Sequence, residues 1–465
     1  MLPSTFRMSI ELLDDLYDCA GYRSAIAVNK KKGSGTYSFV KELASFFRNF
    51  GLLINIGLQF KRLAADKPQA KLFFLGSTIN QAKVLLSLSS FIENRVFFST
   101  MDIKNSPEET IVIPNNLKRS FSWLYNLAVV LYRISNKFSS NSKVYNAHPV
   151  KLKNTFSELF FWRIALRLIK PKIICFSNDH SHSNRSLMLA AKIEGITTLY
   201  LQHADITEKF PRLITSYAFL DGKKALKCLQ ARGIDDCKVY LTGPLRMNQL
   251  DQKSSKIKGK SCLGLAINSL DKTESVRDLI DQLLFSKHIR KLVIRPHPRM
   301  SNRTINFILS SLHDNRIYFS DPKEESVADF LFSIDLMIAG ETSIHGEAFV
   351  AGVTSIYYNM GSGYRDHYGF IRTGLLKVVK NENEILNIIQ NDERPYSCKY
   401  NILDYWYSNL RINGKIGVDI ATNEALKHAG IIKSHEGENM KWSVDKSLET
   451  KRLSQPNNIF YELKQ

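Results

Sequence analysis

The chain has 465 residues, of which 44% are hydrophobic and 23% are charged. These values exclude a disordered, collagen-like or disulfide-scaffold protein, and the length favours two domains or one large α/β unit. The longest apolar runs, residues 52–58 and 127–132, are too short to cross a bilayer. The N-terminal residues lack the order of a secretory signal, so we expect a cytoplasmic protein.

The net charge of +20 is concentrated in the first part of the chain, where residues 1–177 carry 25 basic and 11 acidic side chains, a net charge of +14. Nucleic acid, an anionic membrane surface or a polyanionic substrate would each explain this excess. A basic surface without a specific partner is the fourth interpretation.

Residues 1–67 are predicted to form mostly helices and connections, with a helix over 39–50. Short apolar runs then alternate with helical stretches, which is typical of parallel strands joined by crossover helices. The predicted strands of this block are 71–76, 95–99, 173–177, 197–202, 217–220 and 238–242. The predicted helices are 79–88, 117–170 with a break near 146–149, 186–193 and 223–232.

Residues 251–260 are polar and charged and contain a glycine, which is the composition of a linker. We predict an N-terminal domain over 1–250, a second domain over 261–390, and C-terminal helices with a polar, loosely ordered tail over 391–465. The strands expected in the second domain are 263–267, 291–295, 316–319, 336–339 and 354–358, and the helices are 274–285, 304–312, 327–332, 344–351 and 382–389. Such apolar strands alternating with helices indicate a parallel sheet buried on both faces.

Polar residues gather after four predicted strands, where open parallel sheets bind ligands. The four segments are Ser177-Asn178-Asp179-His180, Gln202-His203-Ala204-Asp205, Arg295-Pro296-His297-Pro298-Arg299 and Gly340-Glu341-Thr342-Ser343-Ile344-His345-Gly346-Glu347. Two lie in each domain, so a cleft between the domains is expected to be lined by all four.

His297 and Pro298 follow an apolar strand between Arg295 and Arg299, so cations gather where the sheet opens to a ligand. A His-Pro pair alone carries no weight, because His148-Pro149 is a second one. We expect Arg295 and His297 to bond to a leaving phosphate. The alternative is a turn with a solvated arginine.

Thr342 and Ser343 are candidate N-caps of the helix that follows them, with Glu341 beside them. Their hydroxyls and the free helix amides would form a pocket for a nucleotide phosphate. Ordinary capping without a ligand is the alternative.

A sugar hydroxyl is a very weak acid, so a positioned carboxylate or imidazole must take its proton when it attacks. Asp179 is the first candidate for this base and His203 the second, with Glu341 and Glu347 as weaker candidates. The alternatives are that Asp179 caps a helix or holds a loop and that His203 is a satisfied polar residue. Secondary candidates for the site are His180, Gln202, Gly243, Arg299 and Glu347.

The chain has no P-loop, no complete dinucleotide fingerprint and no G-x-S-x-G, so P-loop ATP hydrolysis and nucleophilic hydrolysis are not indicated. It also has no Asp-x-Asp, and the pair His180 and His182 has no H-E-x-x-H or cysteine partner. We therefore expect no metal ion and no cofactor, with the diphosphate neutralised by arginine, histidine and a helix dipole.

The order of these features resembles bacterial GT-B-fold glycosyltransferases of surface-polysaccharide synthesis, over about residues 173–358. It is similar to the capsule-synthesis and sialyltransferase-like or Kdo-transferase-like groups, and more distantly to CDP-glycerol glycerophosphotransferases. In the sialyltransferase-like groups a His-Pro motif and a Ser/Thr motif bind the CMP part of the donor, which maps onto His297-Pro298 and Thr342-Ser343. Their acidic base motif is absent as such, and Asn178-Asp179-His180 occupies a comparable place.

The resemblance implies an α/β fold with two Rossmann-like domains facing each other across a cleft, with helical N-terminal and C-terminal additions. The predicted function is metal-independent, inverting transfer of a sugar from a nucleotide-linked donor, with CMP-linked sialic acid or a Kdo-type sugar favoured. The expected acceptor is an anionic or lipid-linked surface glycan, and the expected location is the cytoplasm with peripheral contact to the anionic inner membrane.

Three other functions stay open. They are a CDP-glycerol-type polyol-phosphate transferase, an epimerase or hydrolase of nucleotide sugars with the same fold and, more remotely, a nucleic-acid-binding protein. Nucleic acid is not an expected partner, because binding to it would leave the four polar segments unexplained.

Overall fold

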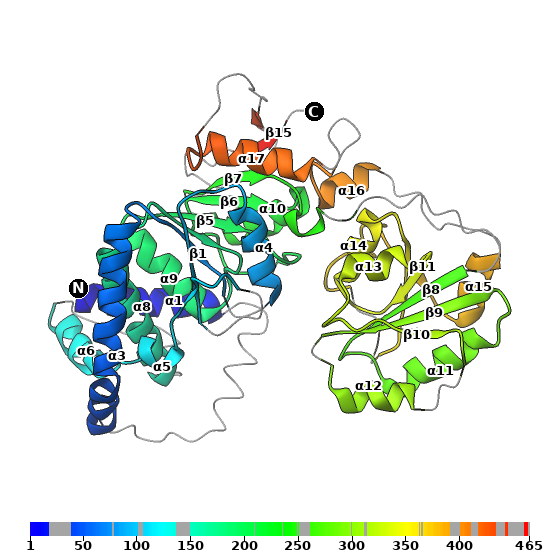
Figure 1. The fold of residues 1–465 in the computed structure, drawn as a ribbon, viewed down its shortest axis with the longest axis horizontal. Coiled ribbons are helices and arrows are strands. Elements are labelled where there is room, and N and C mark those ends of the chain that lie inside the picture. Colours follow the sequence, from blue (N-terminus) through cyan, green and yellow to red (C-terminus); the bar gives the residue numbers. More distant parts are fainter. Residues whose placement is uncertain are drawn as a thin grey trace. The chain divides into compact units, whose positions relative to one another are not determined.

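The chain forms two compact α/β units in a computed structural model (Figure 1). Unit 1 comprises Met1–Arg246 and Val418–Gln465, and unit 2 comprises Met247–Gly417. The structure describes residues 1–17, 39–76, 79–100, 106–135, 149–208, 210–234, 236–248, 250, 261–298, 300–310, 314–361, 363, 366–390, 400–410, 417–433, 442–444 and 460–463. The predicted linker 251–260 lies outside these residues.

Within the described residues, unit 1 has a nine-stranded sheet of order β14-β15-β7-β6-β5-β4-β1-β2-β3, parallel except for the β14–β15 pair. Its strands are β1 (Lys71–Phe74), β2 (Arg95–Ser99), β3 (Ile111–Val112), β4 (Ile173–Phe176), β5 (Thr197–Leu201), β6 (Tyr217–Leu220), β7 (Lys238–Leu241), β14 (Trp442–Val444) and β15 (Phe460–Leu463). The order 3-2-1-4-5-6 of its first strands is that of a doubly wound sheet.

Helices in the described part of unit 1 pack on this sheet and on one another. They are α1 (Leu2–Tyr17), α3 (Phe39–Asp66), α4 (Ile79–Ser89), α5 (Asn115–Lys118), α6 (Leu124–Ser135), α8 (Pro149–Ile169), α9 (His182–Ile193), α10 (Lys223–Arg232) and α17 (Val418–His428). The short helix η1 (Leu245–Met247) spans the boundary between the units in the sequence. Trp162 of α8 packs edge-on against Phe74 of β1, with 5.7 Å between the ring centroids. Both rings are buried, so α8 anchors the helical layer to the centre of the sheet.

The described part of unit 2 has a six-stranded parallel sheet of order β10-β9-β8-β11-β12-β13. Its strands are β8 (Ser261–Ile267), β9 (Ile289–Pro296), β10 (Ile317–Phe319), β11 (Leu336–Ala339), β12 (Thr354–Tyr358) and β13 (Lys377–Val379). Its helices are α11 (Thr273–Leu284), α12 (Asn302–Leu309), α13 (Val327–Phe332), α14 (Ile344–Val350), α15 (Glu382–Gln390) and α16 (Tyr400–Trp406). Numbered within the unit, the strand order is again 3-2-1-4-5-6, so this sheet is also doubly wound.

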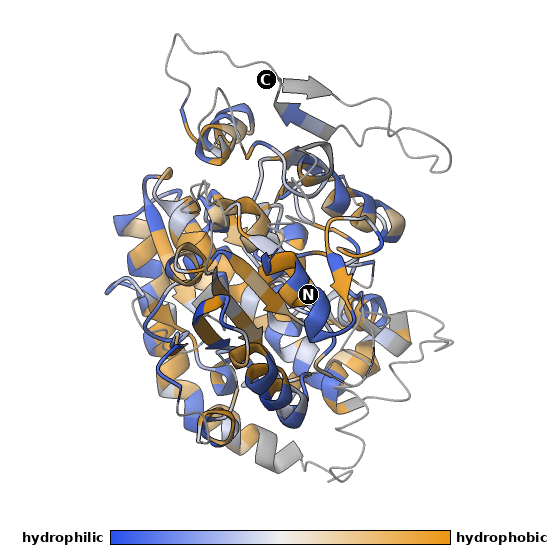
Figure 2. Ribbon diagram, turned by 90° about the vertical axis from the view of Figure 1, so that its right-hand side faces the viewer, coloured by the Kyte–Doolittle hydropathy of each residue, from blue (hydrophilic) through white to orange (hydrophobic). Residues whose placement is uncertain are grey.

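Helices cover both faces of the unit 2 sheet. Successive residues of a strand point to opposite faces, so each central strand contributes to both cores. In β11, Leu336 and Ile338 belong to the core that contains α11, α12 and α15. Met337 and Ala339 belong to the core that contains α13, α14 and α16. The central strands β8 and β11 are therefore largely apolar, and Figure 2 shows hydrophobic strands between helices that carry hydrophobic residues on one side.

Gly264 in β8 shows how closely α13 approaches the sheet. A Cβ atom at this position would lie 2.3 Å from Cδ1 of Ile334 and 2.8 Å from Cζ of Phe330. A larger residue would therefore push α13 off the central strand.

The predicted α/β class with two Rossmann-like sheets is confirmed by these two topologies. The polar tail differs from its prediction where it is described, because β14 and β15 add to the edge of the unit 1 sheet. The strands β3 and β13 were not predicted from the sequence. Each is only two or three residues long and extends the edge of a sheet.

Candidate functional site

Each sheet has one place where the strand order reverses, and doubly wound sheets bind ligands beyond the carboxyl ends of the strands there. In unit 1 this switch point lies between β1 and β4, and in unit 2 between β8 and β11. In unit 1 the loop after β4 contacts the first turn of α4, the helix that follows β1, since the Ser177 hydroxyl donates to the carbonyl of Gln81 at 3.0 Å. The predicted segments that begin at Ser177 and Gly340 therefore follow the strands at which a ligand is expected.

The loop from β4 to α9 is shaped by Asn178 and Ser181. The side-chain oxygen of Asn178 accepts the backbone N–H groups of His180 at 3.0 Å and Ser181 at 2.9 Å. The Ser181 hydroxyl caps α9 by accepting the N–H of Asn184. Asp179 therefore does not cap this helix, and its side chain turns into the protein.

Asp179 is fully buried and lies beside His180. Its Oδ1 is 3.4 Å from Nδ1 of His180, and its Oδ2 has no hydrogen-bond partner among the described residues. The His180 side chain is 39% exposed. A buried carboxylate that accepts Nδ1–H fixes the imidazole and leaves Nε2 as the basic nitrogen.

His203 stacks on His180, with 6.2 Å between ring centroids and 17° between ring planes. Phe210 contacts the His180 ring edge-on at a centroid distance of 4.8 Å. Burial lowers the pKa of His203 to about 4, and the neighbouring His180 ring contributes to the fall. Nδ1 of His203 is buried, and the described side chains offer it no partner. His203 is therefore neutral at physiological pH and a weak base.

Arg246 links two further buried carboxylates in the same part of unit 1. It bonds Asp221 at 2.5 Å and approaches Asp205 at 3.5 Å. Burial raises the pKa of Asp221 to about 6, although Arg246 opposes the rise. Gly243 turns the chain back toward Arg246 after β7 with a φ of +91°, a conformation that favours glycine.

The phenol of Tyr200 lies near the charged groups of Asp179, Asp221 and Arg246. Burial raises its pKa well above the ordinary value, and the carboxylates of Asp179 and Asp221 raise it further. The phenol is therefore protonated and can donate. Its hydroxyl has no hydrogen-bond partner within the described part of the chain, so Tyr200, Asp179 and His203 each present an unpaired polar atom.

Unit 1 thus brings together three of the predicted residues, Asp179, His180 and His203. Gln202 has a structural role, since its amide donates to the carbonyl of Ala204 and its oxygen accepts the N–H of Asp221, both at 3.0 Å. Tyr200, Asp221 and Arg246 lie in the same part of unit 1 and were not predicted from the sequence. Asp221 directly follows β6 and Arg246 follows a Gly-Pro pair after β7, so the strand-end rule would have found both.

In unit 2, Arg295 is buried and its guanidinium is already bonded. It donates to the Ser320 hydroxyl at 2.6 Å and to the carbonyl of Glu325 at 3.0 Å. Its guanidinium also lies 5.5 Å from the centre of the Phe330 ring. These contacts hold the loop between β10 and α13 against β9.

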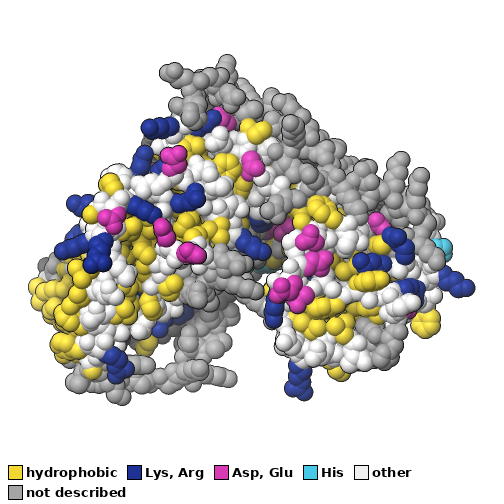
Figure 3. Space-filling model, in the orientation of Figure 1, with side chains coloured by type: hydrophobic (Ala, Val, Ile, Leu, Met, Phe, Trp, Pro, Cys, Tyr) yellow, Lys and Arg dark blue, Asp and Glu magenta, His cyan; other side chains and the backbone are white. Residues whose placement is uncertain are grey.

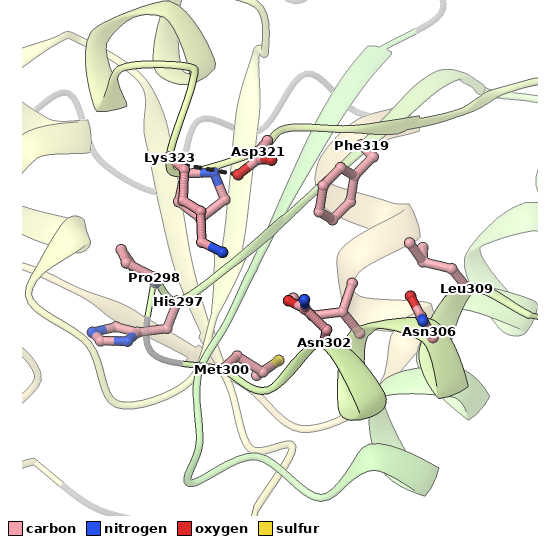
Figure 4. A pocket seen from close by; sticks show the side chains of 11 residues that line it. His297, Pro298, Met300, Asn302, Asn306, Leu309, Phe319, Asp321 and Lys323 are labelled. Carbon is pink, nitrogen blue, oxygen red and sulfur yellow. Dashed lines mark hydrogen bonds between the residues drawn. The ribbon is translucent and has the colours of Figure 1, made fainter.

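His297 and Pro298 are exposed at the end of β9. The N–H of His297 donates to the carbonyl of Ile267 at 2.8 Å, so this residue lies beside the end of β8. Both residues line a pocket of about 200 Å³ between α12 and the loop after β10. Figure 4 shows the Lys323 ammonium over this pocket and the His297 ring turned away from Leu309. Arg299 lies outside the described residues.

The unit 2 switch point is built from Asn268 and the segment after β11. The Asn268 amide donates to the carbonyl of Glu341 at 3.2 Å, and the Glu341 carboxylate accepts the N–H of Tyr368 at 3.2 Å. A Cβ on Gly340 would lie 2.7 Å from Oδ1 of Asp271, so the two loops are in close contact.

The buried His345 side chain fixes the segment after β11 through two hydrogen-bond contacts. Its Nε2 donates to the carbonyl of Gly340 at 2.9 Å and its Nδ1 lies 2.6 Å from the Ser355 hydroxyl. Burial lowers the pKa of His345 to about 4, so the ring is neutral. Thr342, Ser343 and Glu347 are half-buried around the start of α14, and the Ser343 hydroxyl makes no capping bond to the helix. Ordinary side-chain capping by Ser343 is thus not observed.

Among the described residues, no group of three or more His, Cys, Asp or Glu side chains could hold a metal ion. Two doubly wound sheets in one chain give the two-domain α/β architecture of GT-B proteins.

No protein-family model matches the chain, and no curated protein matches it. Solved structures of similar fold include S. aureus MnaA in complex with UDP, with 14% identity over 80% of this chain and 100% of that chain and a TM-score of 0.49. They also include the UDP-GlcNAc 2-epimerase of Neisseria meningitidis bound to UDP-GlcNAc, with 14% identity over 77% of this chain and 99% of that chain and a TM-score of 0.43. A glycosyltransferase of Rickettsia africae is similar as well, with 13% identity over 79% of this chain and 99% of that chain and a TM-score of 0.43.

Proposed function

We propose that the protein is a glycosyltransferase that moves a sugar from a nucleotide-linked donor to the hydroxyl of a glycan acceptor. The observation that carries this proposal is the Asp179–His180 pair, which lies after β4 at a switch point, with His203 stacked on His180 and Tyr200 close enough to feel the charge of Asp179. A buried carboxylate holding a half-exposed imidazole is the arrangement of a general base.

His180 is the proposed base, with Asp179 as its positioning residue. Asp179 has no exposed surface, whereas an acceptor can reach the exposed edge of His180. His203 is a weaker candidate, because its pKa of about 4 leaves little basicity at neutral pH. This changes the order predicted from the sequence, in which Asp179 came first.

In the proposed step, Nε2 of His180 takes the proton of the acceptor hydroxyl as its oxygen forms a bond to the anomeric carbon. The bond from that carbon to the phosphate oxygen breaks, and the nucleotide leaves with the electron pair. The Asp179 carboxylate stabilises the imidazolium that forms. The Tyr200 hydroxyl and Nδ1 of His203 are themselves buried, so neither is assigned a contact with the acceptor.

The nucleotide is assigned to unit 2. The exposed His297 and Lys323 supply groups that can bond to phosphate, and the hydroxyls of Thr342 and Ser343 stand at the neighbouring switch point. Arg295 is proposed to support this loop rather than to bind, because its donors already have partners. CMP as the nucleotide, with a sialic acid or Kdo-type sugar, is proposed on the sequence resemblance alone.

The first test is a thermal-shift series with CMP, CDP, UDP and GDP, since a ligand that binds the folded state raises its melting temperature. Nucleotide sugars of the preferred base are then incubated with and without an oligosaccharide acceptor. Label on the acceptor supports the transferase. Free sugar without acceptor indicates a hydrolase, an isomerised nucleotide sugar indicates an epimerase, and either result overturns the proposal.

A further inference from the structure

Helix α3 has two apolar faces. Leu53, Ile56 and Phe60 pack on the core of unit 1. The opposite face carries four exposed side chains at spacings of three and four residues, which places them in one stripe. They are Phe47 (65% exposed), Phe50 (47%), Ile54 (49%) and Leu58 (50%).

Helix α6 repeats this arrangement. Tyr125 and Ala128 are buried in the core shared with α1 and α8. The other face carries an exposed stripe with the helical spacing i, i+3, i+4, i+7. Its residues are Leu127 (48% exposed), Val130 (52%), Leu131 (37%) and Ile134 (77%).

The two stripes are linked by an aromatic cluster. Phe46 on α3 lies 5.5 Å from Trp123, the residue just before α6, and 5.6 Å from both Phe47 and Phe50, measured between ring centroids. Figure 3 shows hydrophobic side chains gathered on the side of unit 1 where Figure 1 places α6 and α3. We call the eight exposed residues of the two stripes the apolar face.

Cations border this face. Arg48, Lys61 and Arg62 are exposed on α3, and an angle of 100° per residue places Lys61 in line with the exposed stripe. The sequence of α6 contains no acidic residue. Exposed apolar stripes with basic neighbours fit a bilayer that contains anionic lipids. A second copy fits less well, because two such basic faces would repel each other.

We propose that the apolar face of α3 and α6 inserts into the interfacial layer of an anionic bilayer, with Arg48, Lys61 and Arg62 on the lipid headgroups. No helix in the described segments is long and apolar enough to span a membrane. The inference does not depend on the proposed catalytic function.

The test is co-sedimentation of the full chain with vesicles of phosphatidylcholine alone and of phosphatidylcholine with 30% phosphatidylglycerol. We expect binding to the anionic vesicles that weakens as salt rises, because exposed charges are screened. A triple variant, Phe50→Ser, Ile54→Ser and Leu58→Ser, should lower the partition coefficient at least tenfold. Lys61→Glu with Arg62→Glu should lower it on anionic vesicles only.

Phe285→Ser is the matched control, since this phenylalanine is 88% exposed but lies in unit 2. It should bind vesicles like the wild type. An unchanged melting temperature shows that each variant folds. Equal loss in the control, or no wild-type binding to anionic vesicles, overturns the proposal. So does self-association in sedimentation velocity that the triple variant abolishes without any vesicle binding.

Transfer to a soluble acceptor in lipid-free buffer should be unchanged in the triple variant, which separates this test from that of the proposed function.

Discussion

Oδ1 of the fully buried Asp179 lies 3.4 Å from Nδ1 of His180, whose side chain reaches the surface. One residue of this pair is therefore accessible to a substrate and the other is not. The two roles can be separated by mutation, because only the accessible residue can contact the acceptor.

His180→Ala should lower kcat by about 10²–10⁴-fold, which is the usual contribution of a general base. Asp179→Asn should also lower kcat while leaving KM for the donor and the nucleotide-induced thermal shift unchanged, since Asp179 is proposed to act through His180. Steady-state kinetics and thermal shifts measure both. The control is His288→Ala, an exposed histidine of unit 2, which should behave as wild type. Normal turnover in His180→Ala would refute the assignment.

Arg295→Ala and His297→Ala should fail in different ways. Without the Arg295 guanidinium the Ser320 hydroxyl and the Glu325 carbonyl lose their donor, so unit 2 should lose about 2–3 kcal/mol of stability. His297→Ala should keep the melting temperature and lose the shift caused by nucleotide. Differential scanning fluorimetry with and without nucleotide distinguishes the two. A stable Arg295→Ala protein that no longer responds to nucleotide would return Arg295 to the binding site.

Asp271 and His345 should give unit 2 opposing pH dependences. Burial raises the pKa of Asp271 to about 6, so its stabilising contribution is present below about pH 4 and is lost as the pH rises through 6. Burial lowers the pKa of His345 to about 4, so its contribution is present above about pH 6.5 and is lost as the pH falls through 4.

Asp271→Asn should remove the first contribution and keep an acceptor for the N–H of Asn268. The stability of unit 2 should then rise more steeply between pH 4 and 6.5 than in the wild type, by up to about 3 kcal/mol. Hydrogen exchange of amides in β8 and β11 measures this. Parallel pH curves for the two proteins would contradict the expectation.

Gly346 in α14 packs against the buried Tyr407. A Cβ at this position would lie 2.0 Å from the Tyr407 hydroxyl oxygen and 3.0 Å from Cζ. Gly346→Ala should therefore destabilise unit 2 by about 1–3 kcal/mol despite the better helix propensity of alanine. Adding Tyr407→Phe should recover part of the loss, because it removes the closest atom. Urea unfolding of both single variants and the double variant completes the cycle. Additive losses would show that the hydroxyl is not the obstacle.

The central strands could be predicted because the signal was local. Apolar runs such as 263–267 and 336–339 are short, buried on both faces and separated by helices, and the structure places strands there. Predicting the strands also predicted the positions of Asp179, His180 and His203, since a residue that directly follows a buried strand lies at the carboxyl edge of the sheet. The pairing of β15 with β7 could not be predicted, because four residues in a polar tail carry no sign of so distant a partner.

Arg295 shows why the direction of a side chain is harder to predict than its position. The predicted strand ended at this residue, but β9 continues to Pro296. Arg295 is thus a strand residue whose side chain is directed by the pleat toward Ser320 and Phe330. His297 lies beyond the end of β9, so the pleat does not direct its side chain, which is exposed.

The pairing of β15 with β7 affects how the protein folds as it leaves the ribosome. Unit 2 is encoded entirely between these two strands, so it can fold while the edge of β7 is still open. An unpaired strand edge invites association with other chains. Unit 1 is thus the last part to be completed although its synthesis begins first, and nascent chains that stall after unit 2 should need a chaperone at that edge.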